Sequence, residues 1–164
     1  MGLKRAFVIG LCLAAVAAVV MLAAVIIRPP KIYISEICPS NSETSKKTAM
    51  QDKNGEPSDW IEIYNPTNKD ISLTGFSLSK NGGGDQPLGG YVIKAHDYII
   101  VYCSSAGFEN ADFPHADFSI GKVSEAEIIL KYDSFQCESI KMPKLNKGVS
   151  YSTVSYTHLR AHET

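Results

Sequence analysis

The stretch DWIEIYNPTNKDISLTGFSLS, residues 59–79, decides the fold class of this chain. Its first part, within residues 58–65, is rich in aromatic and β-branched side chains, which suit the pleated surface of a strand. Residues 66–69, PTNK, are turn formers, and residues 71–79 return to alternating apolar and polar positions. We therefore predict two strands joined by a turn that reverses the chain.

Similar short runs flank this stretch on both sides. They predict further strands over residues 31–38, 91–93, 98–103, 118–120, 127–132 and 136–141. The polar segment 39–57 predicts a long loop, and the glycines within residues 81–85 predict a flexible connection. Because no amphipathic helix pattern interrupts the strands, the sequence predicts an all-β domain, either a sandwich or a barrel.

The N-terminus has a different pattern. Residues 6–27 are 22 uncharged residues that follow a Lys-Arg pair and precede Arg28 and two prolines. As a helix they would extend about 33 Å, enough to cross a hydrocarbon core of about 30 Å. We predict a cytoplasmic segment over residues 1–5 and a single-pass transmembrane signal-anchor helix over residues 6–27, with the β-domain outside the cell. The alternative is a signal peptide cleaved after the small-x-small site Ala15-Val16-Ala17, which would leave the domain secreted.

Charge and cysteine content narrow the function classes. Residues 29–153 hold 12 lysines, 16 carboxylates and no arginine, without a basic stripe. Binding to nucleic acid needs clustered cations, so nucleic acid is not an expected partner. Cys38, Cys103 and Cys137 lie in the exported part, where one disulfide and one free thiol would be permitted. We favour buried, unpaired thiols, and the absence of any Cys-x-x-Cys motif argues against a zinc site.

Several segments together resemble the lamin-tail domain, an immunoglobulin-like β-sandwich found in nuclear lamins and in many exported bacterial proteins. The resemblance covers about residues 32–152, and its most specific part is the stretch quoted above. It implies an immunoglobulin-like sandwich over residues 28–153, preceded by the transmembrane helix. The motif residues that it assigns to structural roles are Glu36, Asp59, Trp60, Glu62, Tyr64, Asn65, Gly75 and Phe76.

Elementary physical chemistry suggests roles for some of these residues. Glu62 and Asn65 are polar residues among apolar strand positions, and a buried polar group must be hydrogen-bonded. We therefore expect both side chains to hold backbone groups of loops, in preference to contacting a ligand or a metal. Gly75 is expected to be a bulge or a site of close approach before an inward-pointing Phe76.

Motifs for catalysis, cofactors and metals give no comparable signal. No Gly-x-Ser-x-Gly elbow occurs, and His96 and His115 are expected to be surface residues. The segment 52–56, DKNGE, lacks the full spacing of a calcium loop and is expected to be a solvated turn. We therefore predict no catalytic, cofactor-binding or metal-binding residues, and no enzyme activity in this chain.

The last residues, 154–164, read VSYTHLRAHET and do not continue the strand pattern. The string resembles one reading frame of a sequencing-library adapter, which predicts a gene fragment truncated near Thr153 and a non-native tail.

Two functions from different classes remain. The favoured one is a noncatalytic binding or scaffolding module at the bacterial cell membrane, with a protein, envelope or spore-coat component as its ligand. The alternative, implied by the family resemblance, is an accessory N-terminal domain of an exported enzyme such as a CotH-like spore-coat kinase. A hydrolase that uses Glu62 and a histidine is disfavoured, because no supporting motif accompanies them.

Overall fold

A computed structural model describes residues 9, 12, 13, 29–41, 51–52, 55–105, 113–121 and 126–153. The chain divides into two compact units, Met1–Pro30 and Lys31–Thr164. In the first unit Ile9, Cys12 and Leu13 are helical and exposed, and the remainder of the predicted transmembrane helix lies outside the described residues. None of the helices formed by described residues has the length and apolar character needed to cross a membrane. The predicted non-native tail, residues 154–164, also lies outside the described part.

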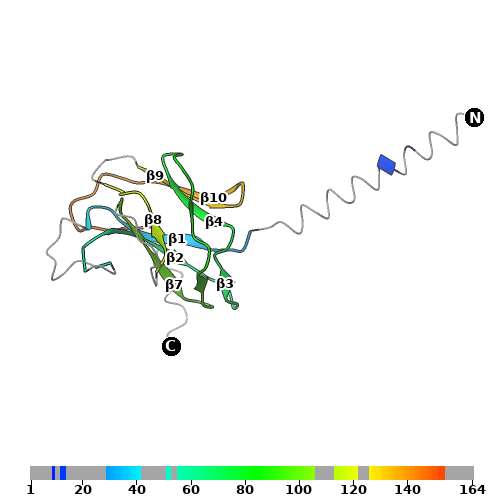
Figure 1. Cartoon of the computed structure of the whole chain (residues 1–164), viewed down its shortest axis with the longest axis horizontal. Coiled ribbons are helices and arrows are strands. Elements are labelled where there is room, and N and C mark those ends of the chain that lie inside the picture. Colours follow the sequence, from blue (N-terminus) through cyan, green and yellow to red (C-terminus); the bar gives the residue numbers. More distant parts are fainter. Residues whose placement is uncertain are drawn as a thin grey trace, which may run out of the picture. The chain divides into compact units, whose positions relative to one another are not determined.

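The second unit is built from strands, and its described residues contain no helix longer than a single turn (Figure 1). One sheet has the order β11-β1-β2-β7-β8 and the other has the order β10-β9-β4-β5, while β3 and β6 form a separate pair. The strands are β1 (Tyr33–Cys38), β2 (Asp59–Tyr64), β3 (Ile71–Ser72), β4 (Phe76–Lys80), β5 (Gln86–Pro87), β6 (Val92–Ile93), β7 (Tyr98–Cys103), β8 (His115–Ala116), β9 (Glu127–Tyr132), β10 (Phe135–Lys141) and β11 (Tyr151–Ser152).

A single apolar core joins the two larger sheets. Strands β1 and β2 contribute Ile34 and Ile63, while β4 and β9 contribute Leu78 and Leu130, and all four side chains are fully buried in one cluster. Because side chains alternate between the two faces of a strand, this cluster fixes which face of each sheet is inward. The arrangement is that of a sandwich, as the sequence predicts.

Most of the longer strands lie where the sequence places them, but two predictions are wrong. The predicted strand 71–79 is split into β3 and β4, because the chain turns at Thr74-Gly75 and the Phe76 amide donates to the Leu73 carbonyl at 2.9 Å. Residues 118–120 do not form a strand, since the Phe118 amide turns back to the Ala116 carbonyl at 2.8 Å. Residues 115–116 form the strand β8 in their place, and it runs parallel to β7.

Candidate interaction surface

The motif residues gather around β2, the middle strand of the five-stranded sheet. Strand β2 contains four of them, and Asn65 follows it directly; the four are Asp59, Trp60, Glu62 and Tyr64. Glu36 lies on the neighbouring β1, where it is the direct partner of Glu62. Gly75 and Phe76 lie elsewhere, at the entrance to β4 in the opposite sheet.

Asn65 organises the loops at one end of β2. Its side-chain nitrogen donates to the carbonyls of Lys69 at 2.7 Å, Lys94 at 2.9 Å and Ile93 at 3.2 Å. Its side-chain oxygen accepts from the amide and the hydroxyl of Thr67 at 3.0 and 2.7 Å. The side chain is fully buried, so it replaces the water that these backbone groups would otherwise need. Both ends of the amide are thus committed to holding the 65–69 turn against the segment after β6.

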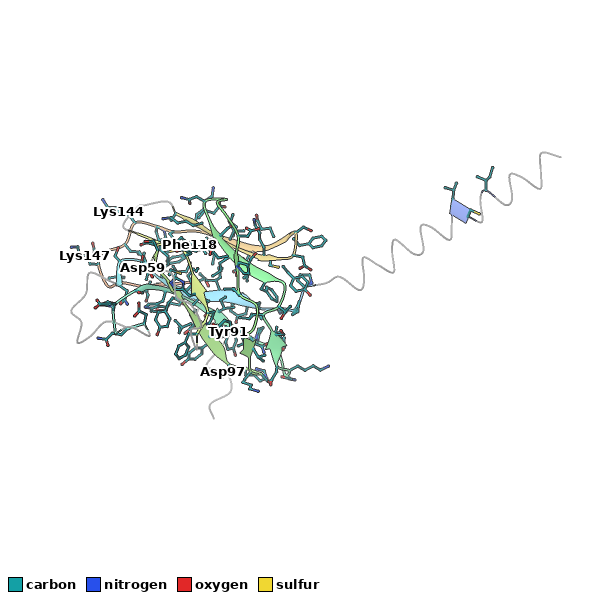
Figure 2. All side chains as sticks on the ribbon, viewed as in Figure 1. Asp59, Tyr91, Asp97, Phe118, Lys144 and Lys147 are labelled. Atoms are coloured by element: carbon teal, nitrogen blue, oxygen red, sulfur yellow. The ribbon has the colours of Figure 1, made fainter. Side chains whose placement is uncertain are left out.

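Asp59 has a similar role at the other end of β2 (Figure 2). Its carboxylate is buried and accepts from the Asn41 amide at 3.1 Å, the Ser119 hydroxyl at 3.0 Å and the Gly121 amide at 3.0 Å. It therefore joins the segment after β1 to the segment after β8. Three hydrogen bonds from neutral donors satisfy a carboxylate without a metal or a cation.

Glu62 has a different kind of partner from the loop backbone that the sequence suggests. Its carboxylate accepts from the Ser35 hydroxyl of β1 at 2.5 Å, and the side chain is half-buried. Ser35 is free to do this because the pairing of β1 with β2 shifts between Ile34 and Glu36, which leaves Ser35 as a bulge. Glu62 therefore braces the neighbouring strand and remains at the surface of the sheet.

Gly75 occupies a position that a side chain would not fit. Its φ is +86°, and an added Cβ would lie 3.1 Å from both the Asp133 carboxylate and the Tyr132 ring. The Phe76 ring points inward and packs edge-on against Tyr132, with 4.8 Å between the ring centroids. The closeness of the β3–β4 and β9–β10 turns therefore depends on the glycine.

Glu138 is a structural residue that the sequence gave no reason to single out. Its carboxylate accepts from the Ile34 amide at 2.7 Å, so β10 reaches across to β1 of the other sheet. Burial raises the pKa of Glu138, and the hydrogen bond from Ile34 offsets part of this effect. Its partner is 104 positions away in the chain, so no local pattern could have revealed the pair.

The outward face of β1, β2 and β7 carries two rows of side chains. The first, which we call the tyrosine row, consists of Tyr33, Tyr64 and Tyr98, one from each strand and paired directly across the sheet. The rings of Tyr33 and Tyr64 are 5.5 Å apart, and Tyr98 is 57% exposed. Burial raises the pKa of Tyr33, with smaller contributions from Tyr64 and Glu138. These rings lie on the face opposite the core and form a platform in contact with solvent.

The second row contains Glu36, Glu62 and Ile100, again direct partners on adjacent strands. All three side chains are half-buried. We call Glu36 and Glu62 the glutamate pair. The next outward-facing side chain of β2 is Trp60, and it is only 9% exposed. The solvent-accessible part of this face therefore ends at the second row.

The cysteines are all free thiols among the described residues. Cys38 and Cys103 are buried, as expected, but Cys137 is exposed at the bulge of β10, so the expectation of burial is wrong for that residue. Cys38 and Cys103 lie on strands separated by β2, about 9–10 Å apart at the usual strand spacing, which is too far for a disulfide.

The histidine and the acidic turn that the sequence analysis considered as sites have ordinary structural contacts. His115 is half-buried beside the Ser104 hydroxyl at 3.1 Å, and burial lowers its pKa. Asp52 accepts from the Ser58 hydroxyl at 2.6 Å and the Glu56 amide at 3.1 Å, as in an ordinary turn. Within the described part of the chain no three His, Cys, Asp or Glu side chains converge as metal ligands would.

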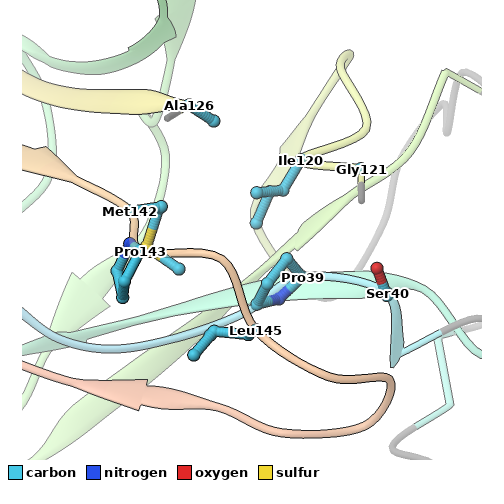
Figure 3. A pocket seen from close by; sticks show the side chains of 8 residues that line it. All are labelled: Pro39, Ser40, Ile120, Gly121, Ala126, Met142, Pro143 and Leu145. Atoms are coloured by element: carbon cyan, nitrogen blue, oxygen red, sulfur yellow. The ribbon is translucent and has the colours of Figure 1, made fainter. Parts of the chain in front are cut away.

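One small hollow opens between loops of the β-domain (Figure 3). Its volume is about 10 Å³, roughly the space of one water molecule. The lining side chains come from three separate segments: Pro39, Ser40, Ile120, Gly121, Ala126, Met142, Pro143 and Leu145. Ligand pockets usually have volumes of about 300–1,000 Å³, so this hollow is too small to be one, and we place the candidate surface on the outer sheet face.

Comparison with known proteins gives one family. The family described as Lamin Tail Domain has a model that matches residues 28–158. None of the curated proteins matches the chain.

Proposed function

The chain belongs to the lamin tail domain family, and from this premise we propose that it is a noncatalytic binding module held at the outer surface of a cell membrane. The observation that carries the proposal is the tyrosine row with its adjacent glutamate pair, on the solvent side of the central strands. Aromatic side chains supply a large rigid contact area at interfaces, and adjacent polar groups orient the partner.

The hydrogen bonds of the polar motif residues support a structural role for them rather than a catalytic one. Asp59 and Asn65 are buried and occupied by hydrogen bonds to loops, and Glu62 braces Ser35. A catalytic acid or base needs a reacting group within hydrogen-bond reach. We expect a Glu62→Gln variant to leave any hydrolytic activity of the preparation unchanged. A large loss of activity that tracks this substitution would overturn the noncatalytic assignment.

The membrane location rests on the 22 uncharged residues of segment 6–27. We expect the full chain to stay in the membrane fraction after alkaline carbonate washing, and protease added to intact cells to digest the β-domain. A full chain that is released by the wash at its original mass would contradict the anchor. Release of a shorter chain that lacks the N-terminus would indicate a cleaved signal peptide.

Binding itself can be tested with the full chain in mild detergent and envelope fractions of the source cells. We expect saturable binding that a Tyr64→Ala, Tyr98→Ala variant loses. The matched control replaces two other exposed apolar residues, Phe135 and Val149, by alanine and should bind normally. Absence of binding to every envelope fraction would contradict the proposed function.

An accessory role beside an exported enzyme domain, such as a CotH-like kinase, is the alternative that the resemblance alone supports. Long-read sequencing of the locus past the codon for Thr153 separates the two roles. A reading frame that continues into an enzyme domain favours the accessory role, and one that closes soon afterwards favours a free-standing module.

A further inference from the structure

The rows on the outer sheet face specify more than a generic contact. Like charges placed directly opposite each other on adjacent strands repel, because their Cβ atoms are only about 4.5–5.5 Å apart. Glu36 and Glu62 are such a pair, and both are half-buried rather than fully hydrated. The ion pairs that the structure shows between described residues, Lys94–Asp70 and Lys131–Asp85, do not include them. The repulsion of the glutamate pair is therefore left without a cationic partner from the described part of the chain.

The tyrosine row is adjacent to this pair on the same face. On this outward face, Tyr33 and Glu36 are successive side chains of β1, and Tyr64 and Glu62 are successive side chains of β2. The faces of aromatic rings attract cations, and arginine in particular stacks on them. Rings and carboxylates side by side thus favour the same kind of ligand group. Lys31 precedes β1, and Tyr33 lies between it and Glu36 along the chain. The lysine is therefore separated from the glutamate pair by the tyrosine row.

Resting on the proposed function, we propose that the tyrosine row and the glutamate pair bind an arginine- or lysine-bearing segment of a partner protein. One cationic side chain lies between the two carboxylates, and the next lies on the tyrosine rings. The carboxylates accept hydrogen bonds from the guanidinium or ammonium group, and the rings cover its apolar stem. Calcium takes about six to eight oxygen ligands, and within the described part of the chain no third His, Cys, Asp or Glu joins the pair, which favours an organic cation over calcium.

The direct test is the affinity of the full chain for a labelled ten-residue peptide of alternating arginine and serine. The matched probe replaces each arginine by citrulline, which keeps the shape and removes the charge. We expect the arginine peptide to bind at least tenfold more tightly than the citrulline peptide. A double variant, Glu36→Gln with Glu62→Gln, should lose this tenfold preference, and Tyr98→Ala should weaken binding at least threefold.

The control variant removes two carboxylates elsewhere, Asp85→Asn with Asp117→Asn, and so changes the net charge equally. An equal loss of affinity in both double variants would overturn the inference, because attraction to net charge would then explain the binding. Equal affinity for the arginine and citrulline peptides would also overturn it. If that occurs while the chain still binds envelope fractions, the proposed function stands and only this ligand assignment fails.

Folding of the test variant has its own readout. Glutamine at position 62 can still accept from the Ser35 hydroxyl, and the two substitutions remove like charges that face each other, so the double glutamine variant should unfold at the same temperature as the parent chain or a higher one. A markedly lower unfolding temperature would show that the two carboxylates stabilise the fold, and it would overturn their assignment as a site kept for a ligand.

Discussion

At the scale of single residues, Asn65 has more side-chain hydrogen bonds than the other motif residues that the structure describes. Replacing it with alanine removes the partners of three carbonyls and of Thr67, all at one end of β2. Buried groups left without a partner each cost about 1–3 kcal/mol, and part of this cost is recovered by solvent entry. We expect Asn65→Ala to lower the free energy of unfolding by about 2–4 kcal/mol, as measured by urea denaturation.

The matched control is another asparagine in the same turn. Asn68 is exposed and contacts the His96 ring at 2.5 Å, so Asn68→Ala should change stability by less than about 1 kcal/mol. Equal effects of the two substitutions would show that the amide network of Asn65 does not stabilise the fold.

Glu138 should make stability depend on pH. Its folded-state pKa is raised, chiefly by burial, above the ordinary value of 4.5. Between 4.5 and this higher value the folded chain binds more protons than the unfolded chain, so the contribution of Glu138 to stability is full below 4.5 and declines as the pH rises through that window.

Glutamine at position 138 can still accept from the Ile34 amide but cannot ionise. We expect Glu138→Gln to remove the decline just described, so that the variant gains stability relative to the parent chain as the pH rises through the window. The measurement is thermal unfolding from pH 4 to pH 8. A difference between the two chains that stays constant over this range would contradict the assigned role.

The sequence revealed hydrogen-bonding roles best where the partners are local. Asn65 could be predicted to hold loop backbone because Thr67 and Lys69 are in the same turn. The hydroxyl bonded to Asp59 is 60 positions away and the amide bonded to Glu138 is 104 positions away, so both contacts exist only once the sandwich has formed.

At the scale of strands and turns, Gly75 determines how closely two turns approach. Gly75→Ala places a side chain at a φ of +86°, and the added carbon meets Asp133 and Tyr132 at 3.1 Å. Gly82→Ala is the matched control, since its φ is also positive, at +67°, and an added Cβ would have no neighbour within 4 Å. The backbone cost of about 1–2 kcal/mol is thus shared, and only Gly75→Ala adds overpacking.

We expect Gly75→Ala to reduce the free energy of unfolding by at least about 1 kcal/mol more than Gly82→Ala does. Chemical denaturation of both variants under the same conditions measures this difference. Equal losses would show that the neighbouring turns move apart without cost and that the close approach is not required.

Strand length explains which strands the sequence predicts. β2, β7 and β9 each have six residues, enough for a run of aromatic and β-branched or other apolar side chains to be recognised. β5 and β8 have two residues each and no periodicity to detect. β8 also pairs in parallel with β7, an arrangement set by the path of the chain rather than by a local pattern.

At the scale of the whole domain, buried polar side chains hold the loops together, and outward polar side chains face the solvent. Buried polar groups such as Asp59 and Asn65 tie loops at the two ends of β2, while the outward face of the same strand presents Glu62 and Tyr64. One strand therefore both organises the sandwich and carries the proposed binding surface. The sequence predicted the strand, but only the pairing with β1 and β7 shows which side chains share its outer face.

The burial of each cysteine predicts how its thiol reacts. Burial, followed by the nearby Asp59 and Glu36 charges, raises the pKa of Cys38 to about 11, and burial also raises the pKa of Cys103. At pH 8 a thiol with a pKa of about 11 is ionised in about one molecule in a thousand, and both sulfurs are shielded from reagents. Cys137 is exposed at the bulge of β10, so its pKa, although raised by partial burial, leaves it the accessible thiol of the β-domain.

We expect a full chain carrying Cys12→Ser to react with an aromatic disulfide reagent at one thiol while folded and at two more only after denaturation. Adding Cys137→Ser should remove the fast reaction and leave the slow ones. Fast labelling of Cys38 or Cys103 in the folded chain would mean that the sheet opens around β1 or β7 far more readily than its buried core implies. A failure of the denatured chain to show the two further thiols would mean that they are paired in a disulfide. That pairing would require strands β1 and β7 to be closer than an intervening β2 allows.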